Sequence, residues 1–372
     1  MPSYDAFLLV SFGGPEGPDD VMPFLANVTR GRNVPPERLA QVAEHYYAFG
    51  GVSPINQQCR DLLAAVRADF AAGGVPLPAY WGNRNWAPCL ADTVRQMAED
   101  GVRRAVAFVT SAYSSYSSCR QYLDDIERAR AAAGPDAPRI DKIRRFFNHP
   151  GFVEPFAGNA RVALATLPAE VRGDAHLVFT AHSIPLAMAE TSGPPGNRGR
   201  YVAELTEAAR LVAERTDAGA HPWSLAYQSR SGPPSQPWLE PDVRDHLAEL
   251  AKSGTQAVVV VPVGFVSDHM EVRHDLDVEA AETADALGLA FARAATPATS
   301  PRFASMITEL VRERMALPEG TLPEGRLPEG TRPEATRPES TMPDTTVSDN
   351  PALGDMGVPS QTCPADCCGG RR

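Results

Sequence analysis

Gly264-Phe-Val-Ser-Asp-His-Met-Glu-Val-Arg-His-Asp-Leu-Asp277 directly follows the apolar run Gln256-Ala-Val-Val-Val-Val-Pro-Val263. The valine-rich run has the length and composition of a strand that is buried on both faces. A strand that ends in a glycine turn and continues into a helix delivers its next residues to the carboxyl edge of a sheet, where open α/β proteins bind ligands. The two segments therefore predict an α/β fold with a site at this edge.

An acidic row follows the strand. We expect a helix to begin near Ser267, and its periodicity then places Asp268, Glu271 and Asp275 on one face. Carboxylates in such a row repel one another unless a cation or a proton lies among them. The alternative is a solvated acidic first turn, which the helix dipole stabilises. The row is a candidate metal or proton site.

The composition is that of an ordinary globular protein, with 372 residues, 43% hydrophobic and 22% charged. At this length two domains are expected. The formal net charge of -11 argues against nucleic acid as a partner, because phosphate binding needs a concentrated positive surface. No membrane span or signal peptide is visible, so we expect a cytoplasmic protein whose six cysteines are free or metal-bound.

Strand and helix patterns alternate along the chain, which predicts two doubly wound α/β domains, 1–150 and 151–316. A five-residue proline-containing repeat with almost no large apolar side chains then runs from 317 to 346. Such a segment does not pack a core, so we expect 317–360 to be a disordered linker. The tail at 361–372 carries three cysteines.

Loops of the first half carry groups that suit a planar ligand with carboxylates. The glycine cluster at 13–18 lacks the lysine of a phosphate-binding loop, so it either lets the backbone approach a flat ligand or simply turns. Arg30 and Arg32 flank a glycine and offer guanidinium groups for bidentate contacts. A Gly-Gly-Val-Ser-Pro turn follows at 50–54 beside aromatic residues. Taken alone, each piece also fits a structural role.

The second half brings chemistry to the sheet edge. A strand at 176–180 ends at Ala181-His182, so His182 and Glu271 reach the same edge from different strands, the usual way in which this class assembles an active site. For a lone histidine, the alternative is a core imidazole bonded to a backbone carbonyl. In the first half, a hydroxyl-rich junction near Tyr122 either caps a helix or lines a pocket.

With these features in place, the chain resembles the ferrochelatases, specifically the actinobacterial kind that acts on coproporphyrin. The resemblance covers the whole folded part and leaves only the linker unmatched. Its motifs, which are specific in combination, are Leu9-Val-Ser-Phe-Gly-Gly-Pro15, Gly50-Gly-Val-Ser-Pro54, Phe179-Thr-Ala-His-Ser-Ile-Pro185, Gln228-Ser-Arg-Ser-Gly-Pro-Pro234, Pro237-Trp-Leu-Glu-Pro-Asp242 and Pro262-Val-Gly-Phe-Val-Ser-Asp-His-Met-Glu271.

The resemblance implies two Rossmann-like halves around a cleft for a porphyrin, with His182 and Glu271 as the pair that binds Fe2+ and deprotonates the macrocycle. A neutral imidazole binds a divalent ion or accepts a proton. Glu271, backed by Asp268 and Asp275, would relay protons outward or pass the ion inward. The residue types leave open which member of the pair accepts the pyrrole proton.

Substrate contacts are also implied by the resemblance. They carry over onto Ser53 and Tyr122, with the backbone near Phe12 approaching the ring and with Arg30 and Arg32 as candidates for propionate contacts. Many bacterial relatives have a tyrosine where Phe12 stands, and a phenyl group cannot ligate the product iron.

Cysteines give a second implied site. Some ferrochelatases hold a [2Fe-2S] cluster with one internal and three C-terminal cysteines, a set that is matched here by Cys119, Cys363, Cys367 and Cys368. Four thiolates are a chemically reasonable cluster site in a reducing cytoplasm. The alternative is a flexible thiol-bearing end that scavenges metal.

The resemblance thus predicts a cytoplasmic lyase that inserts Fe2+ into coproporphyrin III on the way to haem. The same reaction on protoporphyrin IX stays open as an alternative. A different class of alternative is a non-catalytic tetrapyrrole or iron carrier, or a cluster-based redox sensor, on the same scaffold. The presence of both His182 and Glu271 argues against that class.

Overall fold

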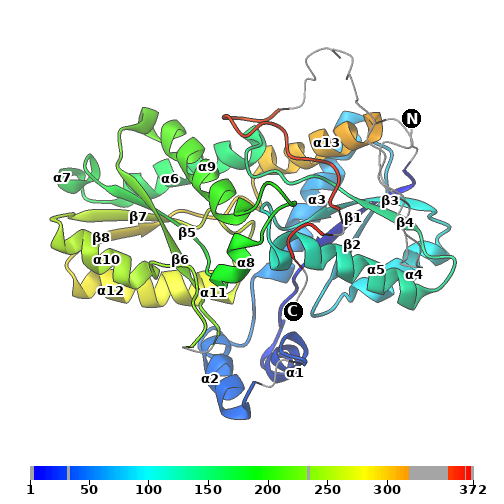
Figure 1. The fold of residues 1–372 in the computed structure, drawn as a ribbon, viewed down its shortest axis with the longest axis horizontal. Coiled ribbons are helices and arrows are strands. Elements are labelled where there is room, and N and C mark those ends of the chain that lie inside the picture. Colours follow the sequence, from blue (N-terminus) through cyan, green and yellow to red (C-terminus); the bar gives the residue numbers. More distant parts are fainter. Residues whose placement is uncertain (1–3, 32–33, 233–234, 318–350, 365, 370–372) are drawn as a thin grey trace.

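The computed structural model describes residues 4–31, 34–232, 235–317, 351–364 and 366–369. It contains two four-stranded parallel sheets flanked by helices, with the matching strand orders β2-β1-β3-β4 and β6-β5-β7-β8 (Figure 1). The predicted α/β fold with two Rossmann-like halves is confirmed. The strands are β1 Ala6–Ser11, β2 Ala79–Asn83, β3 Arg104–Val109, β4 Arg139–Lys142, β5 His176–His182, β6 Trp223–Gln228, β7 Ala257–Val261 and β8 Ala290–Arg293.

The N-terminal sheet is apolar on both faces, as its uninterrupted hydrophobic strands predict. Along β1, Phe7 and Leu9 join one core cluster, whereas Leu8 and Val10 join another. The helices that cover the first face are α3 (Ile55–Gly73) and α13 (Pro301–Ala316), and those that cover the second are α4 (Leu90–Glu99) and α5 (Gln121–Ala133).

The C-terminal sheet is built in the same way. One face packs against α6 (Pro150–Thr166) and α9 (Arg200–Arg215), and the other packs against α10 (Val243–Lys252) and α12 (Ala281–Ala286). The largest core cluster includes residues of both sheets, and α13 contacts both α3 and α6. The two halves therefore share one continuous core.

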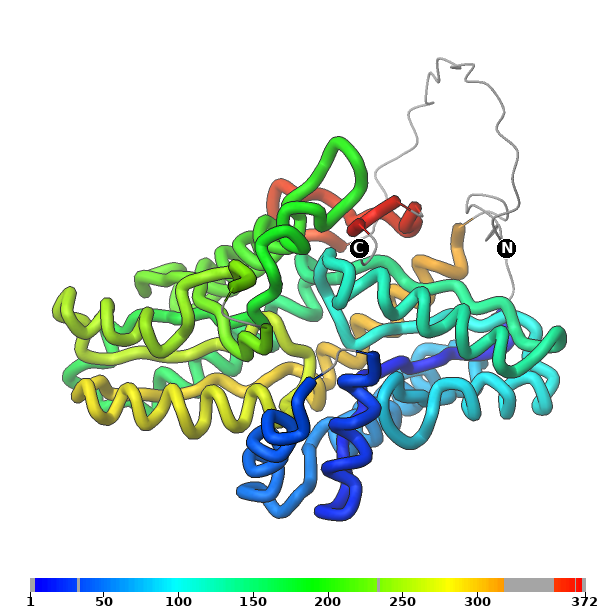
Figure 2. The backbone as a smooth tube through the Cα atoms, turned by 60° about the horizontal axis from the view of Figure 1, so that its bottom comes forward, coloured from blue at the N-terminus to red at the C-terminus, as the bar shows by residue number. Residues whose placement is uncertain are grey.

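Several elements lie outside this framework. Helices α1 (Pro18–Val28) and α2 (Pro36–Tyr47) project from the two sheets (Figure 2) and pack against each other. The short elements are α7 Ala169–Arg172, α8 Leu186–Glu190, α11 Met270–His274, the π-helical turns Tyr116–Arg120 and Asp275–Ala280, and the 3-10 turn Asp217–Gly219. Within the part of the chain that the structure describes, no helix has both the length and the apolarity needed to cross a membrane.

The C-terminal segment differs in part from the predicted linker over 317–360. Residues 318–350 lie outside the described residues, but residues 351–360 lie on the folded part. Leu353 and Met356 pack against the main core. The Leu353 amide donates to the Asn148 carbonyl at 2.8 Å, and the Asn148 side chain donates to the carbonyls of Leu353 at 3.2 Å and Gly357 at 2.9 Å. Apolar residues return once the proline repeat has ended, and their partner Asn148 is remote in sequence.

Candidate active site

His182 and Glu271 lie together at the carboxyl edge of the C-terminal sheet. His182 is the last residue of β5, and Glu271 is in the first turn of α11, which follows the neighbouring strand β7. The Nε2 atom of His182 is 3.5 Å from Oε1 of Glu271. Their side chains are 31% and 47% exposed, so both are accessible to a ligand.

Hydrogen bonds fix the orientation of this pair. The Nδ1 atom of His182 contacts the Ser183 carbonyl oxygen, which leaves Nε2 to face Glu271. The Tyr201 hydroxyl donates to the His182 carbonyl at 2.8 Å, and the Gln228 amide donates to the Glu271 carbonyl at 2.8 Å. Both backbones are therefore held from neighbouring elements.

The two side chains shift each other's pKa values. Burial lowers the pKa of His182, but the charge and hydrogen bond of Glu271 outweigh this effect and raise the pKa to about 8. Burial raises the pKa of Glu271, but the His182 charge outweighs it and lowers the pKa to about 2. At neutral pH the pair is therefore an imidazolium beside a carboxylate.

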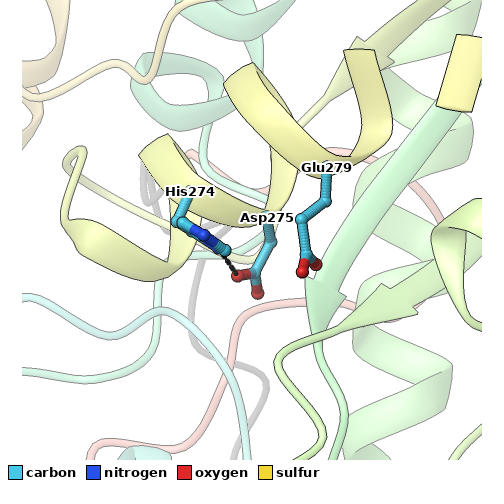
Figure 3. Close-up of side chains that lie close together, drawn as sticks. All are labelled: His274, Asp275 and Glu279. Atoms are coloured by element: carbon cyan, nitrogen blue, oxygen red, sulfur yellow. Dashed lines mark ion pairs between the residues drawn. The ribbon is translucent and has the colours of Figure 1, made fainter. Parts of the chain in front are cut away.

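Acidic groups continue along the helix from Glu271 at a spacing of four residues. His274, Asp275 and Glu279 lie close together (Figure 3), with ligand atoms all within 4.8 Å of one another. Burial raises the pKa of Asp275 to about 7 against a hydrogen bond from Ser229 that lowers it, and the charges of Glu271 and Glu279 raise it further. This geometry suits a divalent cation, which takes imidazole and carboxylate ligands.

Asp268 does not belong to this row. The helix begins at Met270, with His269 as its N-cap, so Asp268 lies in the preceding loop. Its carboxylate accepts from both Nη atoms of Arg293, at 3.3 and 3.2 Å, and from Thr296 Oγ1 at 3.0 Å. The row predicted from a helix start near Ser267 is therefore wrong at its first member.

Sequence analysis did not identify two residues near the row, Glu279 and His45. Glu279 continues the spacing of four from Asp275, so the helical period could have found it. His45 of α2 stacks on His274 with ring centroids 3.7 Å apart and an interplanar angle of 3°. Nothing in the local sequence predicts that contact, because the two histidines come from different halves of the chain.

The expected substrate contacts lie in the N-terminal half. Phe12 is 37% exposed, whereas Ser53 and Tyr122 are buried. The Arg84 guanidinium lies 4.5 Å from the centroid of the Tyr122 ring and 5.8 Å from that of Phe12, so Arg84 covers Tyr122. Sequence analysis did not identify Arg84 as a neighbour of these two aromatic residues.

The remaining expected contacts are Arg30, Arg32 and the backbone of the glycine cluster. Arg30 is exposed just after α1, and Arg32 lies outside the described residues. In the glycine cluster at 13–18 the backbone packs tightly against Ser53. A Cβ added at Gly14 would lie only 2.7 Å from the Ser53 Cβ. Phe12 and Arg30 are thus the expected substrate contacts that are exposed.

The four cysteines singled out above gather at a second place. The thiols of Cys119, in the π-helical turn, and Cys363 perturb each other's pKa, upward for Cys119 and downward for Cys363, and Cys367 contributes to the shift of Cys363. The sulfurs of Cys367 and Cys368 are 3.6 Å apart, and the Gly193 amide donates to Cys368 Sγ at 3.3 Å. All four thiols are free. A set of neighbouring free thiols with a backbone donor fits an iron-sulfur group.

Comparison with known proteins agrees with this geometry. The family model described as Ferrochelatase matches residues 4–315. A coproporphyrin III ferrochelatase of Streptomyces griseus is 51% identical over 377 residues, covering 99% of this chain and 94% of that protein. One of Nocardia farcinica is 57% identical over 312 residues, covering 84% and 88%. The solved structure of SirB from Bacillus subtilis with Fe3+ has a TM-score of 0.53 at 12% identity, covering 84% of this chain and 96% of SirB, which shows a shared fold.

Proposed function

Because the chain belongs to the ferrochelatase family, we propose that it inserts Fe2+ into coproporphyrin III, the substrate in the names of its Streptomyces and Nocardia relatives. The observation that carries the proposal is the 3.5 Å approach of His182 Nε2 to Glu271 Oε1 at a shared sheet edge. An imidazole and a carboxylate offer a ferrous ion one nitrogen and one oxygen donor. The proposal includes the lyase class, because the reaction inserts a metal, and a cytoplasmic location, which the free cysteines support.

Insertion replaces two pyrrole N–H bonds by bonds to iron, so two protons leave for each Fe2+ that enters. His182, with its raised pKa, carries a proton at neutral pH and must release it before Nε2 acts as a ligand or a base. An arriving divalent ion favours this release, because its charge repels the imidazolium. Glu271 stays ionised, so it attracts either the imidazolium or the ion.

The acidic row extends from the pair along the helix. Asp275 has a pKa of about 7, so it exchanges a proton near neutral pH. Glu279, which is 36% exposed, lies at the end of the row away from Glu271. We propose that Asp275 and Glu279 pass Fe2+ inward and protons outward, in the role first expected for Asp268 and Asp275. Their hard oxygen donors hold a divalent ion without the strong bonds of thiolates.

The cysteine site supports a second proposal. We propose that Cys119, Cys363, Cys367 and Cys368 hold a [2Fe-2S] cluster. Bound there, the cluster would supply a one-electron redox centre. The cysteines themselves tie the C-terminal segment to the turn before α5 and, through the Gly193 amide, to the loop after α8.

The test of the main proposal uses anaerobically purified protein. Fe2+ is mixed with coproporphyrin III or protoporphyrin IX, and loss of free-porphyrin fluorescence is followed beside a Glu271→Gln variant. Fast loss with coproporphyrin III that the variant lacks supports the proposed reaction and substrate. Faster loss with protoporphyrin IX would reassign the substrate. No loss with either porphyrin would favour a carrier or a sensor.

The cluster has a separate test. The same anaerobic protein should show visible cluster absorbance that Cys119→Ser abolishes. Cys59→Ser is the matched control, because Cys59 is a buried residue of the main core. A wild-type protein without this absorbance would remove the cluster and leave the proposed iron insertion untouched.

A further inference from the structure

Gln228 is the last residue of β6 and lies beside the pair of His182 and Glu271. In the parallel register of β5 and β6 it is aligned with His182, the last residue of β5. Its main-chain carbonyl accepts from the Ser183 amide at 2.8 Å. Since the Ser183 carbonyl in turn contacts His182 Nδ1, the backbone of Gln228 holds the residue that orients the imidazole.

The side chain of Gln228 reaches the other member of the pair. It is 1% exposed, and its Nε2 atom donates to the main-chain carbonyl of Glu271 at 2.8 Å. The amide cannot be turned around, because its oxygen would then face the carbonyl oxygen. One residue therefore bonds the backbone on both sides of the 3.5 Å separation between His182 Nε2 and Glu271 Oε1.

The bond from Gln228 to Glu271 adds little to stability. The Oε1 atom of Gln228 is buried and has no hydrogen-bond partner among the described residues, and a buried acceptor without a partner is destabilising. The Glu271 carbonyl, in contrast, also accepts from the Asp275 amide within the helix. It would therefore stay paired without Gln228, so the side chain holds a position rather than filling a hydrogen-bonding need.

The next residue extends the same contact. Ser229 has a φ of 62°, in the left-handed region that residues with a side chain rarely adopt. Its hydroxyl donates to the Asp275 carboxylate. The end of β6 thus bonds both the pair and the acidic row, and it does so with a strained backbone, a combination found at functional positions.

We propose that Gln228 is a positioning residue of the candidate active site, which sets the spacing and orientation of His182 and Glu271 for Fe2+. This inference rests on the proposed function. Gln228 itself is too deeply buried to touch the ion or the porphyrin. An ion is held by both members of the pair only when their donor atoms converge, and a small displacement of either weakens binding and slows the reaction.

Two variants remove the side-chain bond and keep the backbone bond to Ser183. Gln228→Met keeps the length of the side chain without its donor and its unpaired oxygen, and Gln228→Asn draws the amide back by one methylene. In both, kcat/KM for Fe2+ should fall about tenfold, whereas the KM for coproporphyrin III should stay within about twofold of the wild type. The Tm of Gln228→Met should stay within about 2 °C of the wild type. Anaerobic calorimetry with Fe2+ alone should show weaker binding in both variants.

Ser224→Ala is the matched control on the same strand. The Ser224 hydroxyl oxygen lies 2.9 Å from His176 Nε2 and 2.6 Å from His246 Nε2, at the other end of β6 from Gln228. Its loss should lower the Tm and leave the Fe2+ kinetics unchanged. A positioning residue and a stabilising residue of one strand thus give opposite patterns of stability and activity.

Each outcome decides between these roles. Unchanged Fe2+ kinetics and binding in both Gln228 variants would overturn the inference, and so would an equal kinetic loss in Ser224→Ala. A fall in Tm in Gln228→Met as large as that in Ser224→Ala, or failure of both Gln228 variants to fold, would assign Gln228 a structural role instead. A wild type that binds Fe2+ but consumes no porphyrin would overturn the proposed function, whereas weaker Fe2+ binding in the variants would still support the positioning role.

Discussion

The hydroxyl of Tyr201 donates a hydrogen bond of 2.8 Å to the main-chain carbonyl of His182. Tyr201 lies in the first turn of α9, and the fully buried Glu204, whose Oε1 is 3.2 Å from Arg145 Nε, follows one turn later on the same helix. The backbone of His182 is thus held by a helix that is itself anchored through a buried ion pair.

Removal of the Tyr201 hydroxyl tests this support. Tyr201→Phe leaves the ring in the core but leaves the His182 carbonyl without its donor, so we expect a loss of about 1 to 3 kcal/mol in the free energy of unfolding. Because the carbonyl belongs to His182, which we propose to bind iron, kcat should fall several-fold while the KM for the porphyrin changes little. Denaturant unfolding and steady-state kinetics measure both. Tyr227→Phe, on the neighbouring strand β6, is the control, and an equal loss of kcat in it would contradict the specific role of Tyr201.

The ion pair of His182 and Glu271 predicts a pH window of stability. The His182 pKa is raised from 6.5 to about 8, so its contribution is fully present below pH 6.5 and is lost as the pH rises through 8. The Glu271 pKa is lowered from 4.5 to about 2, so its contribution is present above pH 4.5 and is lost as the pH falls through 2. The pair therefore stabilises most between pH 4.5 and 6.5.

Thermal unfolding as a function of pH measures this window. The difference in Tm between the wild type and Glu271→Gln should be largest between pH 4.5 and 6.5 and should shrink above pH 8. Glu282→Gln, an exposed acid of α12, should show no such profile. A difference that is constant from pH 4 to 9 would show that the two side chains do not form the ion pair.

The sequence predicts the architecture of the site better than its details. The apolar strands that end at His182 and before Glu271 place both residues at one edge, because parallel strands share their carboxyl end. The start of the helix after β7 is not predictable from the local sequence, because Asp268 bonds to residues that are remote in the chain. Its amide donates to the Gln58 side chain at 2.8 Å, and its carboxylate accepts from Arg293. Such contacts join residues that are far apart in the chain, so no local pattern contains them.

Asp268 and Glu279 should therefore respond differently to neutralisation. Asp268→Asn leaves the partly buried Arg293 with less negative charge, so we expect a loss of about 1 to 3 kcal/mol of stability and an unchanged KM for Fe2+. Glu279→Gln removes a proposed ligand of the row, so the KM for Fe2+ should rise about tenfold, which corresponds to about 1.4 kcal/mol of binding. Glu282→Gln is the matched control for Glu279→Gln. A KM that rises in Asp268→Asn and not in Glu279→Gln would restore the row expected from the sequence.

We expect the Asn148 side chain to hold the C-terminal segment, residues 351–361, against the folded part. Its side chain donates to the carbonyls of Leu353 and Gly357, and its own carbonyl accepts from the Leu353 amide. Asn148→Ala removes the two side-chain bonds, each with a net value of about 0.5–1.5 kcal/mol, and keeps the backbone bond. Amide exchange at 351–361 should become about tenfold faster or more, because local opening of the segment then costs less.

Asn159→Ala provides the comparison, since Asn159 lies on α6, which begins two residues after Asn148, and bonds the Ala295 carbonyl instead of the C-terminal segment. Exchange at 351–361 should be unaffected in that variant. If the segment carries three ligands of a cluster, Asn148→Ala should also lose visible absorbance faster in air than Asn159→Ala, because an opened segment exposes Cys363, Cys367 and Cys368. Unchanged exchange in Asn148→Ala would show that the two side-chain bonds of Asn148 do not hold the segment in place.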